Sequence, residues 1–198
     1  LAVADVAEAV VDALQRAQIL DPIIHNMVPD YQLPFYSVAI SRDGIWMAAG
    51  GTDVRLWDLR NPGAVPLILQ PDAGLGEARV VFSDDSTQLA AGFLSPFTGS
   101  IRIWDLRNPA ARPLLLDAGP VRALAFAPDG IHLASGSRGY PINPNSTRPL
   151  GVLMWDLRNP KTPVLLSQIA PVSNCAPLDC MSANSVNSLM FSPDGDRL

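Results

Sequence analysis

The chain has 198 residues, of which 48% are hydrophobic and 17% are charged, and this balance predicts a folded globular protein rather than a disordered one. Its 14 basic residues against 19 acidic ones give a net charge of −5, so no basic surface is expected to attract a nucleic acid. No apolar run is long enough to span a membrane, and the first residues lack the basic stretch of an export signal. With two cysteines, too few for a disulfide framework, we expect a cytoplasmic protein.

Residues 1–28 are predicted to form a helical segment and a linker, ahead of a second region at 29–198. In the first region apolar residues recur at spacings of three and four, at Val3, Val6, Val10, Leu14 and Ala17. Acidic residues lie on the opposite side of this pattern, which is typical of an amphipathic helix. The helix is expected to end at Asp21, because Pro22 cannot continue it.

The second region contains an internal repeat. The hexapeptide Trp-Asp-Leu-Arg-Asn-Pro occurs three times, starting at Trp57, Trp104 and Trp155. A turn-forming tetrapeptide containing Asp precedes each copy, at 41–44, 83–86 and 127–130, and a fourth occurs at 192–195. Short β-rich runs separated by turns predict four antiparallel strands per unit. The units are expected at about 35–70, 78–117 and 121–168, with an incomplete fourth at 186–198.

Units of this length, with a Ser-Pro-Asp-Gly turn and a terminal Trp-Asp, resemble the WD40 repeats of a β-propeller. The resemblance covers 35–198 and implies an all-β, partial (open) WD40-like β-propeller of three blades plus part of a fourth, preceded by an amphipathic α-helix. The Gly-His pair of many family members is missing, so the family's buried polar network is not expected, although Asp53 and Trp57 match two of its positions. The repeated hexapeptide and the long loops resemble bacterial multidomain members. We expect the chain to be a fragment of a longer protein.

The repeated residues are predicted to be structural. Each tryptophan is expected in the core, and each Asp is expected to pair with the Arg two residues later or to cap a turn. These structural positions are Trp57, Asp58, Trp104, Asp105, Trp155 and Asp156. Trp46 differs from its counterparts, Gln88 and His132, and is expected at the surface.

Three insertions, at 92–100, 136–150 and 170–184, are predicted to share one end of the sheets, because antiparallel strands return alternate connections to the same end. Exposed aromatic and Arg side chains are typical of protein-binding surfaces. The candidate partner-binding residues are Phe93, Leu94, Phe97, Arg138, Tyr140, Ile142, Arg148, Leu178 and Met181. Loops that fold back on the propeller, or insertions without function, remain alternatives.

No catalytic residue, metal site or cofactor is predicted. Cys175 and Cys180 supply at most half of a zinc site, and whether they form a local disulfide stays open. His132 has only Asp129 as a neighbour in its turn, which favours a lone surface histidine. We expect a non-catalytic protein-interaction scaffold or sensor module that binds a protein partner or a neighbouring domain of the same polypeptide. The alternatives are a hydrolase-like propeller enzyme with its site at the central channel, and a sensor that oligomerises through its helix.

Overall fold

The computed structural model describes residues 35–70, 77–94, 99–137, 151–159, 164–168 and 185–198. Every regular element within these residues is a β-strand. The predicted helix at 1–28 lies outside the described residues, as do Cys175 and Cys180. The fold is therefore all-β in its described part, as the turn spacing predicted.

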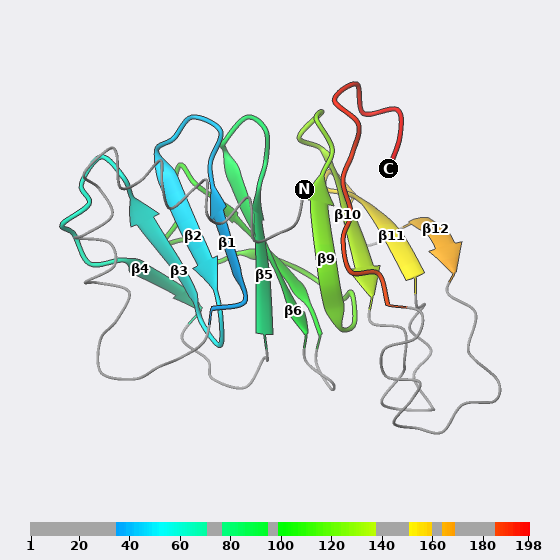
Figure 1. The fold of residues 1–198 in the computed structure, drawn as a ribbon, viewed down its shortest axis with the longest axis horizontal. Coiled ribbons are helices and arrows are strands. Elements are labelled where there is room, and N and C mark those ends of the chain that lie inside the picture. The colour runs from blue at the N-terminus through cyan, green and yellow to red at the C-terminus, as the bar shows by residue number, and fades with distance from the viewer. Residues whose placement is uncertain (1–34, 71–76, 95–98, 138–150, 160–163, 169–184) are drawn as a thin grey trace.

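The strands form three separate four-stranded antiparallel sheets, each with its strands in sequence order (Figure 1). The first sheet contains β1 (Ser37–Ile40), β2 (Trp46–Gly50), β3 (Val54–Asp58) and β4 (Leu67–Gln70). The second contains β5 (Glu77–Phe82), β6 (Gln88–Leu94), β7 (Ile101–Asp105) and β8 (Leu114–Leu116). The third contains β9 (Val121–Phe126), β10 (His132–Ser137), β11 (Gly151–Asp156) and β12 (Val164–Gln168). One sheet per repeat, packed side by side, is the arrangement of an open β-propeller.

The core lies between the sheets. One cluster of buried side chains joins the first sheet to the second and includes Leu56, Phe82 and Trp104. Another joins the second sheet to the third and includes Ile103 and Trp155. Apolar residues on both faces of a strand, which the sequence shows, are explained by this sandwiching of each sheet between neighbours.

A glycine near the end of each second strand lets the next sheet approach closely. A Cβ atom at Gly50 would lie 2.6 Å from the backbone oxygen of Ala78, and one at Gly92 would lie 2.4 Å from Cγ1 of Val121. The same holds at Gly136, where a Cβ would lie 2.4 Å from Cγ1 of Val186. These glycines therefore fix how closely successive sheets can pack.

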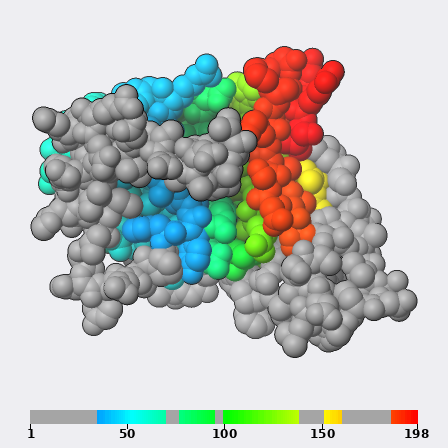
Figure 2. Space-filling view, viewed as in Figure 1, coloured from blue at the N-terminus to red at the C-terminus, as the bar shows by residue number. Residues whose placement is uncertain are grey.

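Residues 185–198 continue the repeat beside the third sheet (Figures 1 and 2). The backbone N–H of Val186 donates to the carbonyl of Ser137 at 3.2 Å. A turn follows in which the N–H of Gly195 donates to the carbonyl of Ser192 at 2.8 Å, and Gly195 has a φ of 78°. The segment thus begins a fourth unit with the same turn as the first three.

Candidate functional site

The strand order sorts the connections into two ends of the sheets. One end, the turn face, carries the β1–β2, β5–β6 and β9–β10 turns and the three Asp-Leu-Arg segments (Figure 1). The other end, the insertion face, carries the connections that leave β2, β6 and β10 at Gly50, Leu94 and Ser137. The strand order places the connections as predicted, but the insertions lie mostly outside the described residues, and 92–94 and 136–137 are strand residues.

Two of the predicted partner-binding residues are described, and one of those predictions is wrong. Phe93 is fully buried, with 0% of its surface exposed, and the guanidinium carbon of Arg102 lies 5.5 Å from its ring centre. β6 runs through Leu94, so Phe93 is a strand residue that faces a neighbouring sheet. Leu94 is half-buried at the strand end. The remaining candidates lie outside the described residues, namely Phe97, Arg138, Tyr140, Ile142, Arg148, Leu178 and Met181.

The turn face is built first from Ser–Asp turns. The hydroxyl of Ser41 donates to Oδ1 of Asp43 at 2.6 Å, and the N–H of Ile45 donates to the same oxygen at 3.0 Å. Gly44 completes the turn with a φ of 71°, a left-handed conformation that glycine adopts without strain. The Ser41 hydroxyl is the main reason that the pKa of Asp43 lies below its usual value. The carboxylate is thus used to close its own turn.

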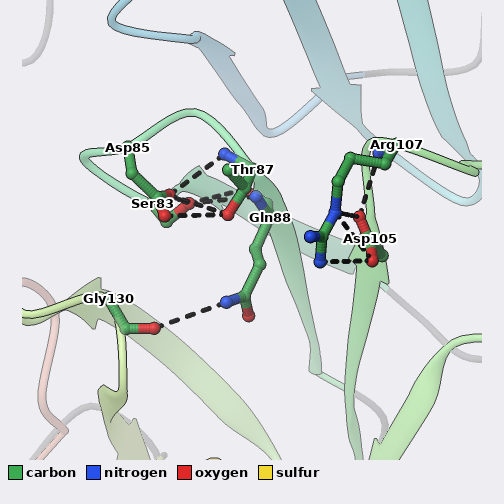
Figure 3. A network of polar contacts seen from close by, with 7 residues as sticks. All are labelled: Ser83, Asp85, Thr87, Gln88, Asp105, Arg107 and Gly130. Carbon is green, nitrogen blue, oxygen red and sulfur yellow. Dashed lines mark hydrogen bonds and ion pairs between the residues drawn. The ribbon is translucent and has the colours of Figure 1, made fainter.

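The second turn has the same bonds and adds a threonine (Figure 3). Ser83 donates to Oδ1 of Asp85 at 2.6 Å, and the backbone N–H and hydroxyl of Thr87 donate to that oxygen at 3.0 and 2.9 Å. Ser86 occupies the glycine position with a φ of 58°. These hydrogen bonds, led by the one from Ser83, lower the pKa of Asp85.

The third turn has Ala127 in place of the serine, and a histidine side chain contacts the turn aspartate instead. Nδ1 of His132 lies 2.5 Å from Oδ2 of Asp129, and the N–H groups of Ile131 and His132 donate to Oδ1 at 2.8 and 2.9 Å. Burial pushes the pKa of Asp129 upward, but the bonds from His132 and the backbone outweigh it, so this pKa is lowered. His132 is therefore paired within its own turn, where it stabilises a loop.

Each repeated Asp and Arg form a forked ion pair. Nε and Nη2 of Arg107 donate to Oδ1 and Oδ2 of Asp105 at 2.9 and 2.8 Å, as Figure 3 shows, and the first and third repeats have the same fork. The bond from Arg158 is the main cause that lowers the pKa of Asp156 to about 2. The prediction of a structural ion pair at this position is confirmed in all three repeats.

Polar side chains also connect neighbouring sheets at the turn face. The N–H of Asp43 donates to the hydroxyl of Ser86 at 3.1 Å, and Arg42 pairs with Asp84 at 3.1 Å. Nε2 of Gln88 reaches the carbonyl of Gly130 in the next turn at 3.3 Å (Figure 3). These bonds hold successive turns in register. Their partners lie in different repeats, so the sequence alone does not reveal them.

Gln88 also lines a groove between the second and third sheets, which we call the Gln88 groove. It has a cavity volume of about 400 Å3 and lies beside two of the Asp–Arg forks. Its other lining residues are Ile103, Asp105, Arg107, Arg112, Leu114, Gly130, Ile131, Leu157 and Arg158. Sequence reasoning missed this groove, although the unlike residues at the repeat position of Trp46 and Gln88 were a signal for it.

Trp46 is half-buried, so its predicted surface exposure is only partly correct. The ring packs on the core cluster between the first and second sheets, and the guanidinium carbon of Arg60 lies 5.8 Å from its centre. A single repeat could not show this, because the cluster includes residues of the neighbouring sheet.

The repeated tryptophans are all buried, at 2% exposure each, as predicted. Nε1 of Trp155 donates to the hydroxyl of Ser135 at 2.8 Å. In the first sheet Asp53 pairs with Arg55 at 2.9 Å, whereas Nε1 of Trp57 has no hydrogen-bond partner among the described residues. The buried polar network of the family is therefore incomplete in this repeat, in line with the missing Gly-His pair.

The inner strands β1, β5 and β9 and residues 187–189 surround a cavity of about 160 Å3. Arg79 and Arg122 line it, together with Ser37 and Ser188, and its described lining includes no carboxylate or histidine. Across the described ranges, no three His, Cys, Asp or Glu side chains form a group that could hold a metal ion. Nor does the described part contain a helix long and apolar enough to cross a membrane.

A family model described as "WD domain, G-beta repeat" matches residues 116–139. The matched residues run from Leu116 through β9, the Asp129 turn and β10. These are the first two strands of the third sheet. No curated protein matches the chain in a search with its sequence.

Proposed function

We propose that this WD40-repeat protein is a non-catalytic interaction module, which displays binding loops from its insertion face to a protein partner or a neighbouring domain of the same polypeptide. The family match supports the proposal, since WD40 repeats generally mediate contacts between proteins. Three packed sheets give the rigidity that such display requires.

The observation that carries the proposal is how the charged groups of the repeats are used. The repeated Asp and Arg residues bond to each other, and the turn Asp residues bond within their own turns. Carboxylates committed in this way are poorly placed to act as catalytic acids or bases. The repeats then serve as a frame, and recognition is assigned to residues outside the frame.

The insertion face offers the residues that best suit recognition. β6 and β10 both end there, and the segments that follow them contain Phe97, Tyr140 and Arg148. Aromatic and Arg side chains supply most of the binding energy at many protein interfaces. The proposal also includes a cytoplasmic location and no cofactor or membrane; the absence of a nucleic-acid partner is in keeping with the net charge of −5.

The test is quantitative partner capture with the whole chain as bait. Phe97→Ala, Tyr140→Ala and Arg148→Ala should each reduce the recovered partner while leaving the melting temperature unchanged. Arg60→Ala is the matched control, because this exposed arginine belongs to the turn face and lies outside the Gln88 groove. Equal capture by the insertion variants, with loss in Arg60→Ala, would contradict the proposed face.

A further inference from the structure

The Gln88 groove exists where one repeat lacks a large side chain. At the interface of the first and second sheets, Trp46 packs between the sheets beneath Arg60. At the next interface the same repeat position holds Gln88, whose amide instead bonds to Gly130 of the third sheet. An indole is much larger than a carboxamide, so this interface keeps an opening of about 400 Å3.

The walls of the groove offer apolar surface to a ligand. Leu114, on the outer strand β8, is 38% exposed, and Ile131 and Leu157 are half-buried on the side of the third sheet. Ile103 also lines the groove and belongs to the buried core cluster of the two sheets. Apolar surface on both sides of a groove favours the burial of an aliphatic side chain between them.

The charged groups that line the groove are three arginines and one aspartate. Arg107 is bonded to Asp105, and Arg158 is bonded to Asp156. Arg112 is exposed and makes no hydrogen bond or ion pair with any described residue. Beyond the lining, Asp85 and Asp129 act on these forks through space, but both carboxylates are held by bonds within their own turns. Arg112 is thus the cation left to receive an anion.

We propose that the Gln88 groove binds an acidic peptide segment of a partner protein, with an aliphatic side chain between Leu114 and Ile131 and a carboxylate beside Arg112. A segment with both features gains apolar burial and a charge-assisted hydrogen bond from the same contact. Because the chain as a whole has a net charge of −5, an acidic segment would be held here by the local cation Arg112 and the apolar walls, and not by attraction to the overall charge.

This inference goes beyond the proposed function, because the groove opens at the turn face and uses no residue of the insertion face. The two proposals can therefore fail separately. Loss of binding in Tyr140→Ala concerns the insertion face, and loss in Arg112→Glu concerns the groove.

The experiment uses the whole chain and a fluorescein-labelled peptide of alternating Asp and Leu, measured by fluorescence anisotropy. One control peptide has Ser in place of each Leu, and another has Lys in place of each Asp. The Asp-Leu peptide should bind at least about tenfold more tightly than either control, and its affinity should fall as salt is added.

Two variants locate the binding. Gln88→Trp places an indole where the first interface has Trp46, and Arg112→Glu reverses the unpaired charge; each should weaken the Asp-Leu peptide about tenfold or more. Arg42→Glu is the matched charge control, because this exposed arginine lies on the turn face outside the groove and should leave the affinity nearly unchanged. If Gln88→Trp fails to fold, Arg112→Glu still tests the groove, because Arg112 is exposed and its replacement should not disturb the core.

Several results would overturn the proposal. They are no binding of the Asp-Leu peptide, equal binding of the Asp-Ser peptide, unchanged affinity in Arg112→Glu, or an equal loss in Arg42→Glu. Equal binding of Asp-Ser would show that the groove attracts an anion without using its apolar walls. An equal loss in Arg42→Glu would show attraction by overall charge.

Discussion

The first and second inter-sheet interfaces are built from the same repeat, yet they carry different side chains at one repeat position, Trp46 in the first and Gln88 in the second. Both have an Asp–Arg fork at the strand end and a glycine on the second strand. In the first, Trp46 fills the space beside the fork, and in the second Gln88 leaves a groove. One variable position per repeat can therefore leave room for a ligand at an interface that otherwise has only a structural role.

The two interfaces also differ in what limits their spacing. Gly50 lies against the backbone oxygen of Ala78, and a backbone atom cannot move aside by side-chain rotation. Gly92 approaches the side chains of Val121 and Leu124. The N–H of Ala78 further donates to the carbonyl of Gly51 at 2.9 Å, which joins the backbones of the first two sheets. The first interface thus contains a direct backbone contact between its two sheets.

The largest expected effect concerns this spacing. Gly50→Ala should lower the free energy of unfolding by about 3 kcal/mol, because a methyl group against a backbone oxygen can be accommodated only by separating the sheets. Gly92→Ala should also destabilise, but part of its cost should be recovered in combination with Val121→Ala, which removes the nearest methyl group. Urea unfolding of the single and double variants measures both effects. A Gly50→Ala protein as stable as the wild type would show that the sheets are not in close contact there.

The second prediction exchanges the variable residues. Trp46→Gln should destabilise the protein by about 2 kcal/mol, because a half-buried aromatic ring is lost from the core contact and Arg60 loses its ring partner. Gln88→Trp should change stability by no more than about 1 kcal/mol, since the groove can receive the ring. Thermal unfolding checks both, with Trp46→Phe as the conservative control. Equal losses in both variants would show that the two positions are packed alike.

The third prediction concerns the buried indole of the second interface. Ser135→Ala should cost about 1 to 2 kcal/mol, because Nε1 of Trp155 would lose its hydrogen-bond partner in a buried position. Ala49 is the repeat counterpart of Ser135, two residues beyond the register partner of the tryptophan, and it belongs to the same buried cluster as Trp57, whose Nε1 has no partner among the described residues. Ala49→Ser should therefore be neutral or slightly stabilising in the same denaturation experiment. A clear loss in Ala49→Ser would mean that the two sites differ in geometry.

The smallest expected effect is the pH dependence of the forks. Because the pKa values of Asp58, Asp105 and Asp156 are lowered, chiefly by the Arg two residues later, their stabilisation is present above the unfolded pKa of about 3.9 and is lost as the pH falls through the folded values. Carboxyl carbon NMR should show Asp156 titrating at about pH 2. Arg158→Lys should move that titration upward, because lysine cannot form the fork. An Asp156 midpoint near 3.9 in the wild type would contradict the fork in solution.

The turns and the strand order were predictable because the interactions that form them are local. Ser41, Asp43 and Gly44 close a turn with bonds that span a few residues, and the same pattern returns in the second turn. Asp58 likewise bonds to an arginine two residues away. A residue pattern that recurs with its partners close in sequence can be interpreted without knowing what packs on it.

The two corrected predictions share a different cause. Phe93 was expected in an exposed loop, but β6 continues through Leu94, because its backbone pairs with the start of β5. Trp46 was expected at the surface, but its ring packs on a cluster of buried residues from both the first and the second sheet. In both cases the deciding partner lies in another strand or another sheet, at a distance in sequence that no local pattern records.

The sequence by itself determined the all-β repeat, its turns, its forked ion pairs and the core position of Trp57, Trp104 and Trp155. Short-range hydrogen bonds and the periodic placement of apolar residues fix these features within each unit. The groove at Gln88 and the packing of Trp46 could be seen only in the folded protein, because both depend on how a side chain meets the next sheet. Packing between sheets joins residues far apart in the chain, and side-chain volume at those contacts sets where a groove remains.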